Sequence, residues 1–244
     1  GFTPLADRFL REDQLDEPEV YYPLEVYMCT QCGLAQLSYV VPPDILYQND
    51  YPYESSTTAA GKRHWSDFAT FVTERLSLDS NDLVVDIGSN VGVLLEAFSS
   101  HGARVQGVDP ASNIASIAEK RGIETICAFF DMDTATKIVE TKGKASVITA
   151  TNVFAHIDDL NSFMAAVQFL LEDSGVLIIE APYFLNLVNN LEYDTIYHEH
   201  LSYLSVKPLV RFFKKFGMEV FDIQEVDIHG GSFRIFAARE SQMR

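Results

Sequence analysis

The sequence is short of basic residues: it has 18 Lys and Arg against 35 Asp and Glu, which gives a formal net charge of -17. Binding to DNA or RNA through the phosphate backbone requires basic side chains, so this balance argues against a nucleic acid partner. It argues equally against attachment to an anionic membrane surface. A small anionic ligand needs only a few local cations, so the composition does not exclude one.

Cysteine and long apolar runs are also scarce. The three cysteines are Cys29, Cys32 and Cys127, an odd and low number that favours a reducing compartment over a disulfide scaffold. No apolar run reaches the length of a membrane-spanning helix, and no signal peptide opens the chain. We therefore expect a cytoplasmic protein without a membrane partner. The sequence does not predict the oligomeric state.

What the chain does have is apolar residues, which make up 47% of its 244 positions. This is enough for one large domain with a small module. Residues 1–50 differ from the rest by their prolines, their acids and the pair Cys29 and Cys32, and we expect them to form an N-terminal module. Residues 51–244 are expected to form the main domain.

Strand and helix patterns alternate through the main domain. Helices are predicted at residues 64–76, 91–100, 115–122, 160–171 and 207–216, and strands at 83–88, 103–109, 124–127, 145–153 and 175–181. Such alternation predicts an α/β fold with a mostly parallel sheet covered by helices. Two further strands, 218–226 and 232–239, are separated only by a Gly-Gly turn region and predict an antiparallel hairpin on that sheet.

The first strand of the main domain ends in an acid and a glycine-rich turn, Asp86-Ile87-Gly88-Ser89-Asn90-Val91-Gly92. Its pattern is D-x-G-x-x-x-G, whereas the dinucleotide fingerprint is G-x-G-x-x-G. The acid at Asp86 suits a ligand with positive charge better than a diphosphate. The second strand ends at Asp109, whose carboxylate can accept ribose hydroxyls. A generic nucleotide-binding domain or a dehydrogenase is the alternative, with Asp86 merely capping the turn.

The turn, the second acid and the final hairpin together resemble the class I S-adenosylmethionine-dependent methyltransferases. The resemblance implies that S-adenosylmethionine is the methyl donor and S-adenosylhomocysteine the product. It implies cofactor contacts from Asp86, Gly88, Ser89, Asn90 and Gly92 in the turn, from Asp109 to the ribose, from Asp131 to the adenine and from Asn152 to the methionyl end.

Four proton-handling side chains stand in consecutive positions at Tyr197-His198-Glu199-His200. They follow the apolar strand 175–181, and loops after the carboxyl ends of strands are where α/β enzymes place their chemistry. Methyl transfer to oxygen or nitrogen often needs little beyond orientation. A carbon acceptor needs a base that removes a proton beside a carbonyl, and this segment offers such a base.

This segment and four others resemble the sugar C-methyltransferases of deoxysugar biosynthesis. The matching strings are Y-H-E-H-L-S-Y from Tyr197, Pro4-Leu5-Ala6, Cys29-x-x-Cys32-Gly33-Leu34, Tyr51-Pro52-Tyr53-Glu54-Ser55-Ser56, and His229-Gly230-Gly231-Ser232-x-Arg234. Their common order extends the resemblance over nearly the whole chain. It implies C-methylation of a nucleotide-linked 3-keto-deoxysugar, with thymidine diphosphate as the expected carrier.

The same resemblance implies the catalytic roles. His200 would be the general base, and Tyr197 would support the enolate or orient the base. Glu199 would hold an imidazole or a sugar hydroxyl, and His156 would assist from the loop after the fourth strand. The implied substrate contacts are Tyr51, Tyr53, Ser55, Tyr183, His229 and Arg234.

Several other histidines and tyrosines are interpreted as structural residues and not as parts of the site. His198 is expected to be bonded to the backbone, and His64 and His101 are expected at the surface. Tyr193 and Tyr203 are expected in walls or core. Lys62, Arg63, Arg211 and Arg234 are candidate diphosphate contacts, although each taken singly is better explained as a solvated charge.

The family resemblance also implies a zinc site of four cysteines, of which this chain holds only Cys29 and Cys32. Either the chain is a fragment with half of the site, or this member does without the metal. We expect zinc to be absent or poorly held, residues 1–50 to be less stable than the rest, and Cys127 to be a core residue. The family's further C-terminal α/β domain is expected to be missing as well.

Two alternatives stay open. One is an O- or N-methyltransferase with a small-molecule acceptor, in which His200 deprotonates a hydroxyl or only orients the acceptor. The other is a module that binds S-adenosylmethionine without catalytic activity.

Overall fold

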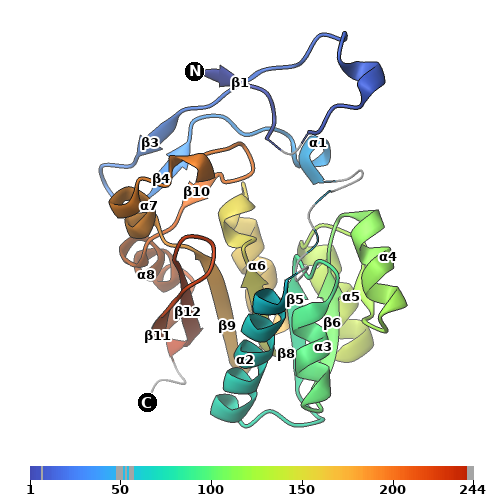
Figure 1. Ribbon diagram of the computed structural model, residues 1–244. Coiled ribbons are helices and arrows are strands. Elements are labelled where there is room, and N and C mark those ends of the chain that lie inside the picture. The colour runs from blue at the N-terminus through green and yellow to red at the C-terminus, as the bar shows by residue number, and fades with distance from the viewer. Residues whose placement is uncertain (7, 48–51, 53, 55–57, 241–244) are drawn as a thin grey trace.

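The computed structural model describes residues 1–6, 8–47, 52, 54 and 58–240. A seven-stranded sheet with helices on both faces forms the main domain, and the N-terminal module lies across one end of it (Figure 1). No helix in the described part of the chain has both the length and the apolar character needed to cross a membrane.

The main sheet has the strand order β11-β12-β9-β8-β5-β6-β7. Its strands are β5 (Leu83–Ile87), β6 (Arg104–Val108), β7 (Thr125–Ile126), β8 (Ala145–Thr151), β9 (Leu171–Pro182), β11 (Met218–Val226) and β12 (Ser232–Arg239). The pairs among β7, β6, β5, β8 and β9 are parallel, whereas β12 runs antiparallel to both β9 and β11. The predicted parallel sheet with an antiparallel final hairpin is therefore confirmed.

Helices cover both faces of this sheet, which explains why a central strand such as β5 is buried along its whole length. One face packs against α2 (Ala59–Leu76), α3 (Val93–Ser100) and α4 (Ser112–Lys120). The other packs against α5 (Met132–Lys142), α6 (Leu160–Leu170) and α8 (Val206–Lys214). The sequence analysis did not predict α5, although Ala135 and Ile138 bury one side of it. It also did not predict the short α7 (Phe184–Asn190).

The N-terminal module consists of short strands and turns. Strands β1 (Phe2–Thr3) and β2 (Tyr22–Pro23) pair with each other, and β3 (Val26–Met28) pairs with β4 (Ala35–Leu37). The described part of the module also contains a 3₁₀ turn at Glu12–Gln14 and the helix α1 (Pro43–Tyr47). Two further 3₁₀ turns, at Phe154–His156 and Tyr193–Thr195, lie outside the module.

Strand β4 joins the module to the main domain. It pairs antiparallel with β10 (Ser202–Tyr203), which begins two residues after His200. The amide of Leu37 also donates to the carbonyl oxygen of Leu201 at 2.9 Å. The module is therefore hydrogen-bonded directly to the segment that follows the predicted catalytic residues.

One sequence expectation on the sheet edge is wrong. Cys127 lies just past the end of β7 and is exposed, with its Sγ 3.7 Å from the carbonyl oxygen of Pro110. Strand β7 has only two residues, so Cys127 falls outside the sheet and outside the core.

Candidate active site

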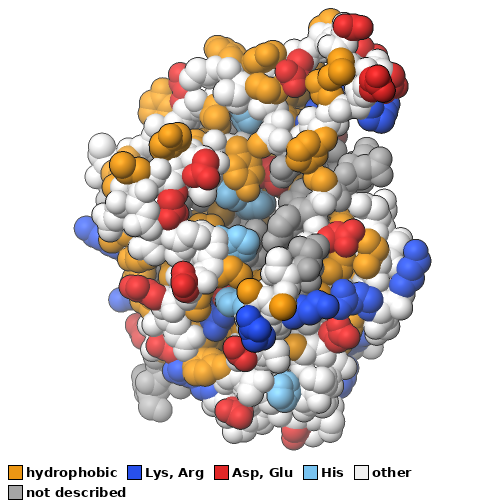
Figure 2. All heavy atoms as spheres, in the orientation of Figure 1, with side chains coloured by type: hydrophobic (Ala, Val, Ile, Leu, Met, Phe, Trp, Pro, Cys, Tyr) orange, Lys and Arg blue, Asp and Glu red, His pale blue; other side chains and the backbone are white. Residues whose placement is uncertain are grey.

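A cavity of about 1100 Å³ lies at the carboxyl ends of β5, β6 and β8. The strand order reverses between β5 and β8, the point at which open α/β sheets bind ligands. Of the predicted site residues, the cavity brings together Asp86, Gly88, Ser89, Asn90, Asp109, Asp131, Asn152, His156, Tyr197, His200 and His229. Figure 2 shows histidine side chains along the recess between the N-terminal module and the main domain.

The glycine-rich turn forms one wall because its backbone adopts conformations that side chains disfavour. Gly88 has φ +67°, and a Cβ there would lie 2.2 Å from Cγ2 of Val153. Gly92 has φ +78° and a Cβ would meet Ile123 at 3.0 Å. Gly92 is not among the residues that line the cavity, and its predicted contact with the cofactor stays a prediction.

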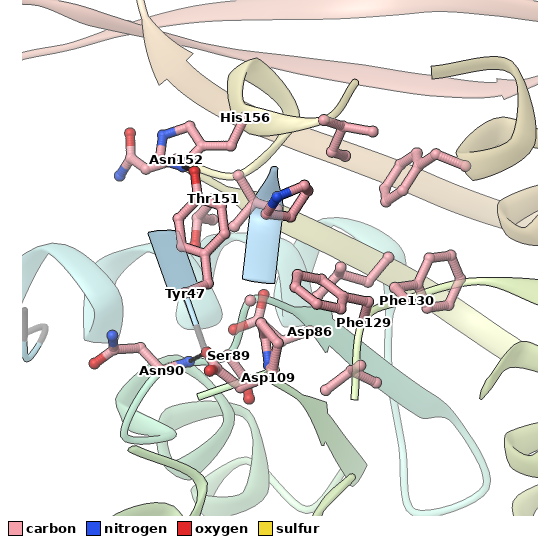
Figure 3. A pocket seen from close by; sticks show the side chains of 18 of the residues that line it. Tyr47, Asp86, Ser89, Asn90, Asp109, Phe129, Phe130, Thr151, Asn152 and His156 are labelled. Carbon is pink, nitrogen blue, oxygen red and sulfur yellow. Dashed lines mark hydrogen bonds between the residues drawn. The ribbon is translucent and has the colours of Figure 1, made fainter. Parts of the chain in front are cut away.

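The carboxylate of Asp109 is fixed against this turn. Its Oδ2 accepts from the amide of Asn90 and its Oδ1 from the amide of Ala111, both at 2.9 Å. Burial raises the pKa of Asp109, while the two amide hydrogen bonds act in the opposite direction. The two bonds hold the acid in one orientation at the cavity edge (Figure 3).

Asp86 lies deeper, 2% exposed, and its Oδ1 accepts from the Oγ1 of Thr149 at 2.6 Å. Burial raises the pKa of Asp86 to about 7, and the charges of Asp109 and Glu180 add to the effect. A positively charged ligand nearby would therefore favour ionised Asp86.

The charged lining residues of the cavity are all acidic. They are Asp86, Asp109, Asp131, Asp133, Asp158, Asp159, Glu192 and Asp194, and no Lys or Arg lines the cavity within the described ranges. This charge balance favours a ligand that carries positive charge.

Two buried polar atoms of the cavity wall lack a partner among the described residues, Oγ of Ser89 and Oδ1 of Asn152. Asn152 has φ +57° and follows β8, and its own amide donates to the carbonyl oxygen of Glu180 at 2.7 Å. Buried polar atoms are rarely left unpaired. Both oxygens can accept a donor from a ligand.

Phe129 and Phe130 form an apolar wall opposite Asn152 and His156 (Figure 3). Phe130 packs edge-on against Phe163 of α6, with ring centroids 5.3 Å apart. Asp131 comes next and caps α5, accepting from the amide of Thr134 at 2.8 Å. The wall combines a flat apolar surface with a carboxylate, a combination that suits a purine.

The imidazole of His200 has both ring nitrogens engaged. Nδ1 lies 2.7 Å from the carbonyl oxygen of Thr195, and Nε2 lies 3.0 Å from the hydroxyl of Tyr197. Because a carbonyl oxygen only accepts, Nδ1 carries a proton, and in the neutral form of the ring Nε2 carries the lone pair. His200 thus presents an acceptor nitrogen beside a phenol within the cavity.

His156 lies beside His200, with ring centroids 5.1 Å apart. Burial lowers the pKa of His156 to about 3, with a smaller contribution from His200. The ring is therefore neutral at physiological pH. Its Nδ1 is 3.2 Å from the hydroxyl of Tyr47, a residue of α1 that the sequence analysis missed. The sequence gives no signal for this contact, because it joins positions 109 residues apart.

Glu199 and His198 are not among the residues that line the cavity, and they are 4% and 1% exposed. The expectation that His198 bonds to the backbone is wrong, since neither ring nitrogen has a hydrogen-bond partner among the described residues. Its ring instead meets Tyr22 of the N-terminal module edge-on at 5.9 Å between centroids. His198 therefore belongs to the packing between the module and the main domain.

Arg234 was expected to bind substrate, but it does not line the cavity and is paired with Glu180 instead. Its Nε and Nη2 donate to Oε2 of Glu180 at 2.9 and 2.6 Å, and its guanidinium lies 3.6 Å from the ring centroid of Phe68. His64, expected at the surface, is 2.7 Å from Oε1 of the same carboxylate. Burial alone would raise the pKa of Glu180, but the hydrogen bonds and charges of His64 and Arg234 outweigh it and lower that pKa.

The other residues that were predicted to contact the substrate differ in their positions relative to the cavity. His229 lines the cavity in a left-handed conformation, φ +51°, and burial lowers its pKa. Tyr183 is outside the cavity and packs against Phe233, with centroids 5.0 Å apart. Tyr51, Tyr53 and Ser55 lie outside the described residues.

Cys29 and Cys32 lie between β3 and β4 as half-buried free thiols. Backbone amides of Cys32, Gln31 and Gly33 and the thiol of Cys32 lower the pKa of Cys29, which favours a thiolate. However, no group of three or more metal-binding side chains comes together in the described part of the chain. A structural zinc ion needs four ligands, so these residues do not by themselves fit one.

Comparison with known proteins gives two family matches. A family described as "Methyltransferase domain" matches residues 61–223, and one described as "Putative zinc binding domain" matches residues 1–47. The C-methyltransferase NovU of Streptomyces niveus is 39% identical over 238 residues, 98% of this chain and 56% of that protein. A ubiquinone biosynthesis O-methyltransferase of Rhodopseudomonas palustris (strain BisB5) is 25% identical over 104 residues, 43% of this chain and 41% of that protein.

The chain thus spans about half the length of these relatives. Among solved structures, magnesium protoporphyrin IX methyltransferase (ChlM) from Synechocystis PCC 6803 with bound SAH matches with a TM-score of 0.55. The match covers 77% of this chain and 90% of that chain at 14% identity, which concerns the fold alone. The predicted class I methyltransferase fold is confirmed.

Proposed function

Because the chain belongs to the family of methyltransferase domains, we propose that it uses S-adenosylmethionine to methylate a carbon atom of a nucleotide-linked 3-keto-deoxysugar. Similarity to a C-methyltransferase over nearly the whole chain supports transfer to carbon. The proposed sugar carrier is thymidine diphosphate, as the family resemblance implies.

The cavity supports a cofactor with positive charge at one end and a purine at the other. Asn152 Oδ1, which has no partner among the described residues, would accept from the ammonium group, and Asp109 would accept from the ribose. The wall of Phe129 and Phe130 would hold the adenine. When bound, S-adenosylmethionine supplies a methyl group on a positively charged sulfur.

The observation that carries the proposal is the state of His200. Its Nε2 presents a lone pair in the same cavity as Asp86 and Asp109, while Thr195 holds the proton on Nδ1. Transfer to carbon requires a base of this kind, whereas transfer to oxygen often does not. His200 is therefore assigned as the general base.

The proposed reaction assigns a role to each of these groups. Nε2 of His200 takes a proton from the carbon next to the ketone, and the electron pair of that C–H bond moves onto the ketone oxygen as an enolate. The hydroxyl of Tyr197, now released from Nε2, donates to this oxygen. The enolate carbon would then take the methyl group from the sulfonium, whose carbon–sulfur bond would break with its electron pair left on sulfur, so that S-adenosylhomocysteine leaves and the ketone re-forms. His200 would return its proton to solvent. A positioned base contributes about 100- to 10,000-fold to such a step.

Solvent exchange tests this assignment. The protein is incubated in deuterium oxide with a thymidine-diphosphate keto-deoxysugar and without methyl donor, and proton NMR follows the hydrogen next to the ketone. We expect exchange with the wild type and none above background with His200→Asn. Exchange at equal rates in both proteins would remove His200 from the role of base.

Similarity to an O-methyltransferase supports a second candidate, transfer to a hydroxyl of a small molecule. His200 would then deprotonate that hydroxyl, and no carbon-bound hydrogen would exchange. Methylation without exchange, with the new methyl resonance on oxygen, would favour this candidate. A module without activity would bind S-adenosylhomocysteine and methylate no acceptor.

A further inference from the structure

Tyr47 reaches the cavity from a part of the chain outside the sheet domain. It is the last residue of α1 in the N-terminal module, and both it and Pro43 line the cavity. Its hydroxyl lies 3.2 Å from Nδ1 of His156, and the two rings are stacked with centroids 6.0 Å apart and planes inclined by 20°. The contact therefore combines a hydrogen bond with a ring contact.

The direction of this hydrogen bond determines what His156 offers to a ligand. A neutral imidazole carries one N–H and one acceptor nitrogen, and the partner of one nitrogen sets the role of the other. A phenol hydroxyl is a good donor, and an imidazole nitrogen is a good acceptor. A bond from Tyr47 to Nδ1 leaves the proton on Nε2.

We propose that Tyr47 is a positioning residue, which donates to Nδ1 of His156 and so keeps its Nε2–H available as a donor in the cavity. The two neighbouring imidazoles then have opposite roles: His200 accepts a proton at Nε2, and His156 donates a hydrogen bond. This inference rests on the proposed function, because the oxygen that His156 would serve is that of the enolate.

A purely structural role is the competing explanation, in which Tyr47 only fastens the module to the main domain. The module has other attachments, however. Strand β4 pairs with β10 through Gln36 and Ser202, and Leu37 donates to Leu201. Loss of one hydroxyl should therefore leave the module in place, and Tyr47→Phe removes the hydroxyl while it keeps the ring.

The direct test is ¹⁵N NMR of the imidazole nitrogens in protein labelled at histidine, with His156→Gln to assign the resonances. In the wild type we expect His156 to be the Nε2–H tautomer. In Tyr47→Phe we expect its shifts to move toward a mixture of tautomers. Tyr27→Phe is the matched control, since Tyr27 is in the same module and 58% exposed. Unchanged His156 shifts in Tyr47→Phe would overturn the proposal.

Kinetics of the full reaction provide a second test. Tyr47→Phe should lower kcat by about three- to tenfold, as loss of one hydrogen bond implies, with the KM for S-adenosylmethionine unchanged. In the His156→Gln background the same substitution should have no further effect. Effects that multiply would show that Tyr47 does not act through His156. If the wild type methylates no sugar, the proposed function fails while the NMR result still decides the role of Tyr47.

Discussion

The Nδ1 of His200 lies 2.7 Å from the backbone carbonyl oxygen of Thr195, five residues earlier in the same loop. This contact orients the ring and keeps its proton on the side away from Tyr197. The hydroxyl of Tyr197 occupies the other nitrogen at 3.0 Å. The loop therefore sets the tautomer of the His200 imidazole through its own backbone, before any substrate is bound.

Asp86→Asn should change the pH dependence of folding. The pKa of Asp86 is raised from 3.8 to about 7 in the folded protein, so the folded state binds the proton more tightly than the unfolded chain. The carboxyl group then lowers stability progressively as pH rises from about 4 to about 7. Above pH 7, Asp86→Asn should raise the free energy of unfolding by up to about 4 kcal/mol.

Urea unfolding at pH 5 and pH 8 measures this difference, and the gain should be larger at pH 8. Glu140→Gln, an exposed substitution with the same change of charge, is the control. Binding of S-adenosylhomocysteine should weaken in Asp86→Asn only. A variant that is equally stabilised at both pH values would contradict the assignment of a raised pKa to Asp86.

Gly88→Ala should disrupt the cofactor side of the cavity. Its φ of +67° is unfavourable for alanine, and its Cβ would lie 2.2 Å from Cγ2 of Val153. Strain of this kind costs about 1–3 kcal/mol, and the displaced Val153 adds overpacking of similar size. Gly102→Ala is matched in backbone, with φ +96°, and has nothing within 4 Å of its Cβ.

The free energy of unfolding should therefore fall more for Gly88→Ala than for Gly102→Ala. Val153→Ala should recover part of the difference when it is combined with Gly88→Ala. Equal losses for the two glycine variants would mean that contact with Val153 has no energetic weight.

Arg234→Met should destabilise the protein strongly, because it leaves the buried carboxylate of Glu180 with His64 as its one remaining side-chain partner among the described residues. Breaking one side of a buried ion pair costs about 3–5 kcal/mol. Arg234→Lys should recover only part of the loss, since it cannot reproduce both hydrogen bonds or the stacking on Phe68. Thermal and urea unfolding measure both effects.

Arg11→Ala is the control, because the side chains of Arg11 and Asp13 are 72% and 71% exposed. An exposed pair of this kind contributes at most about 1 kcal/mol. If Arg234→Met costs no more than Arg11→Ala, the buried pair does not stabilise the fold, and Arg234 becomes available again as a candidate substrate contact.

The sheet and the cofactor side of the cavity were predictable because their signals are local. Apolar runs mark the strands, and Asp86 and Asp109 stand directly at strand ends that a parallel sheet brings to one edge. The glycine-rich turn at Gly88 is likewise predicted by a motif of consecutive residues. These features can be predicted without knowing which distant residues are in contact.

Several residues that the sequence analysis placed wrongly or missed have partners far away in the sequence. Tyr47 meets His156 across 109 positions, and His64 meets Glu180 across 116. The sequence suggested that Arg234 is a solvated cation. In the structure, the hairpin places it directly opposite Glu180 on the neighbouring strand. Residue type gives the chemistry of such a side chain, whereas the fold determines whether it faces a ligand or a buried partner.

The most direct test of the central claim is mass spectrometry of a reaction with S-adenosylmethionine and a panel of thymidine-diphosphate keto-deoxysugars, run with the wild type and with His200→Asn. We expect one sugar to gain a single methyl group, bound to carbon in the fragment spectrum. The rate should fall about 100- to 10,000-fold in His200→Asn, with unchanged binding of S-adenosylhomocysteine. Methyl transfer at the wild-type rate in His200→Asn, or a methyl group found on oxygen, would contradict the assignment of His200 as the base for C-methylation.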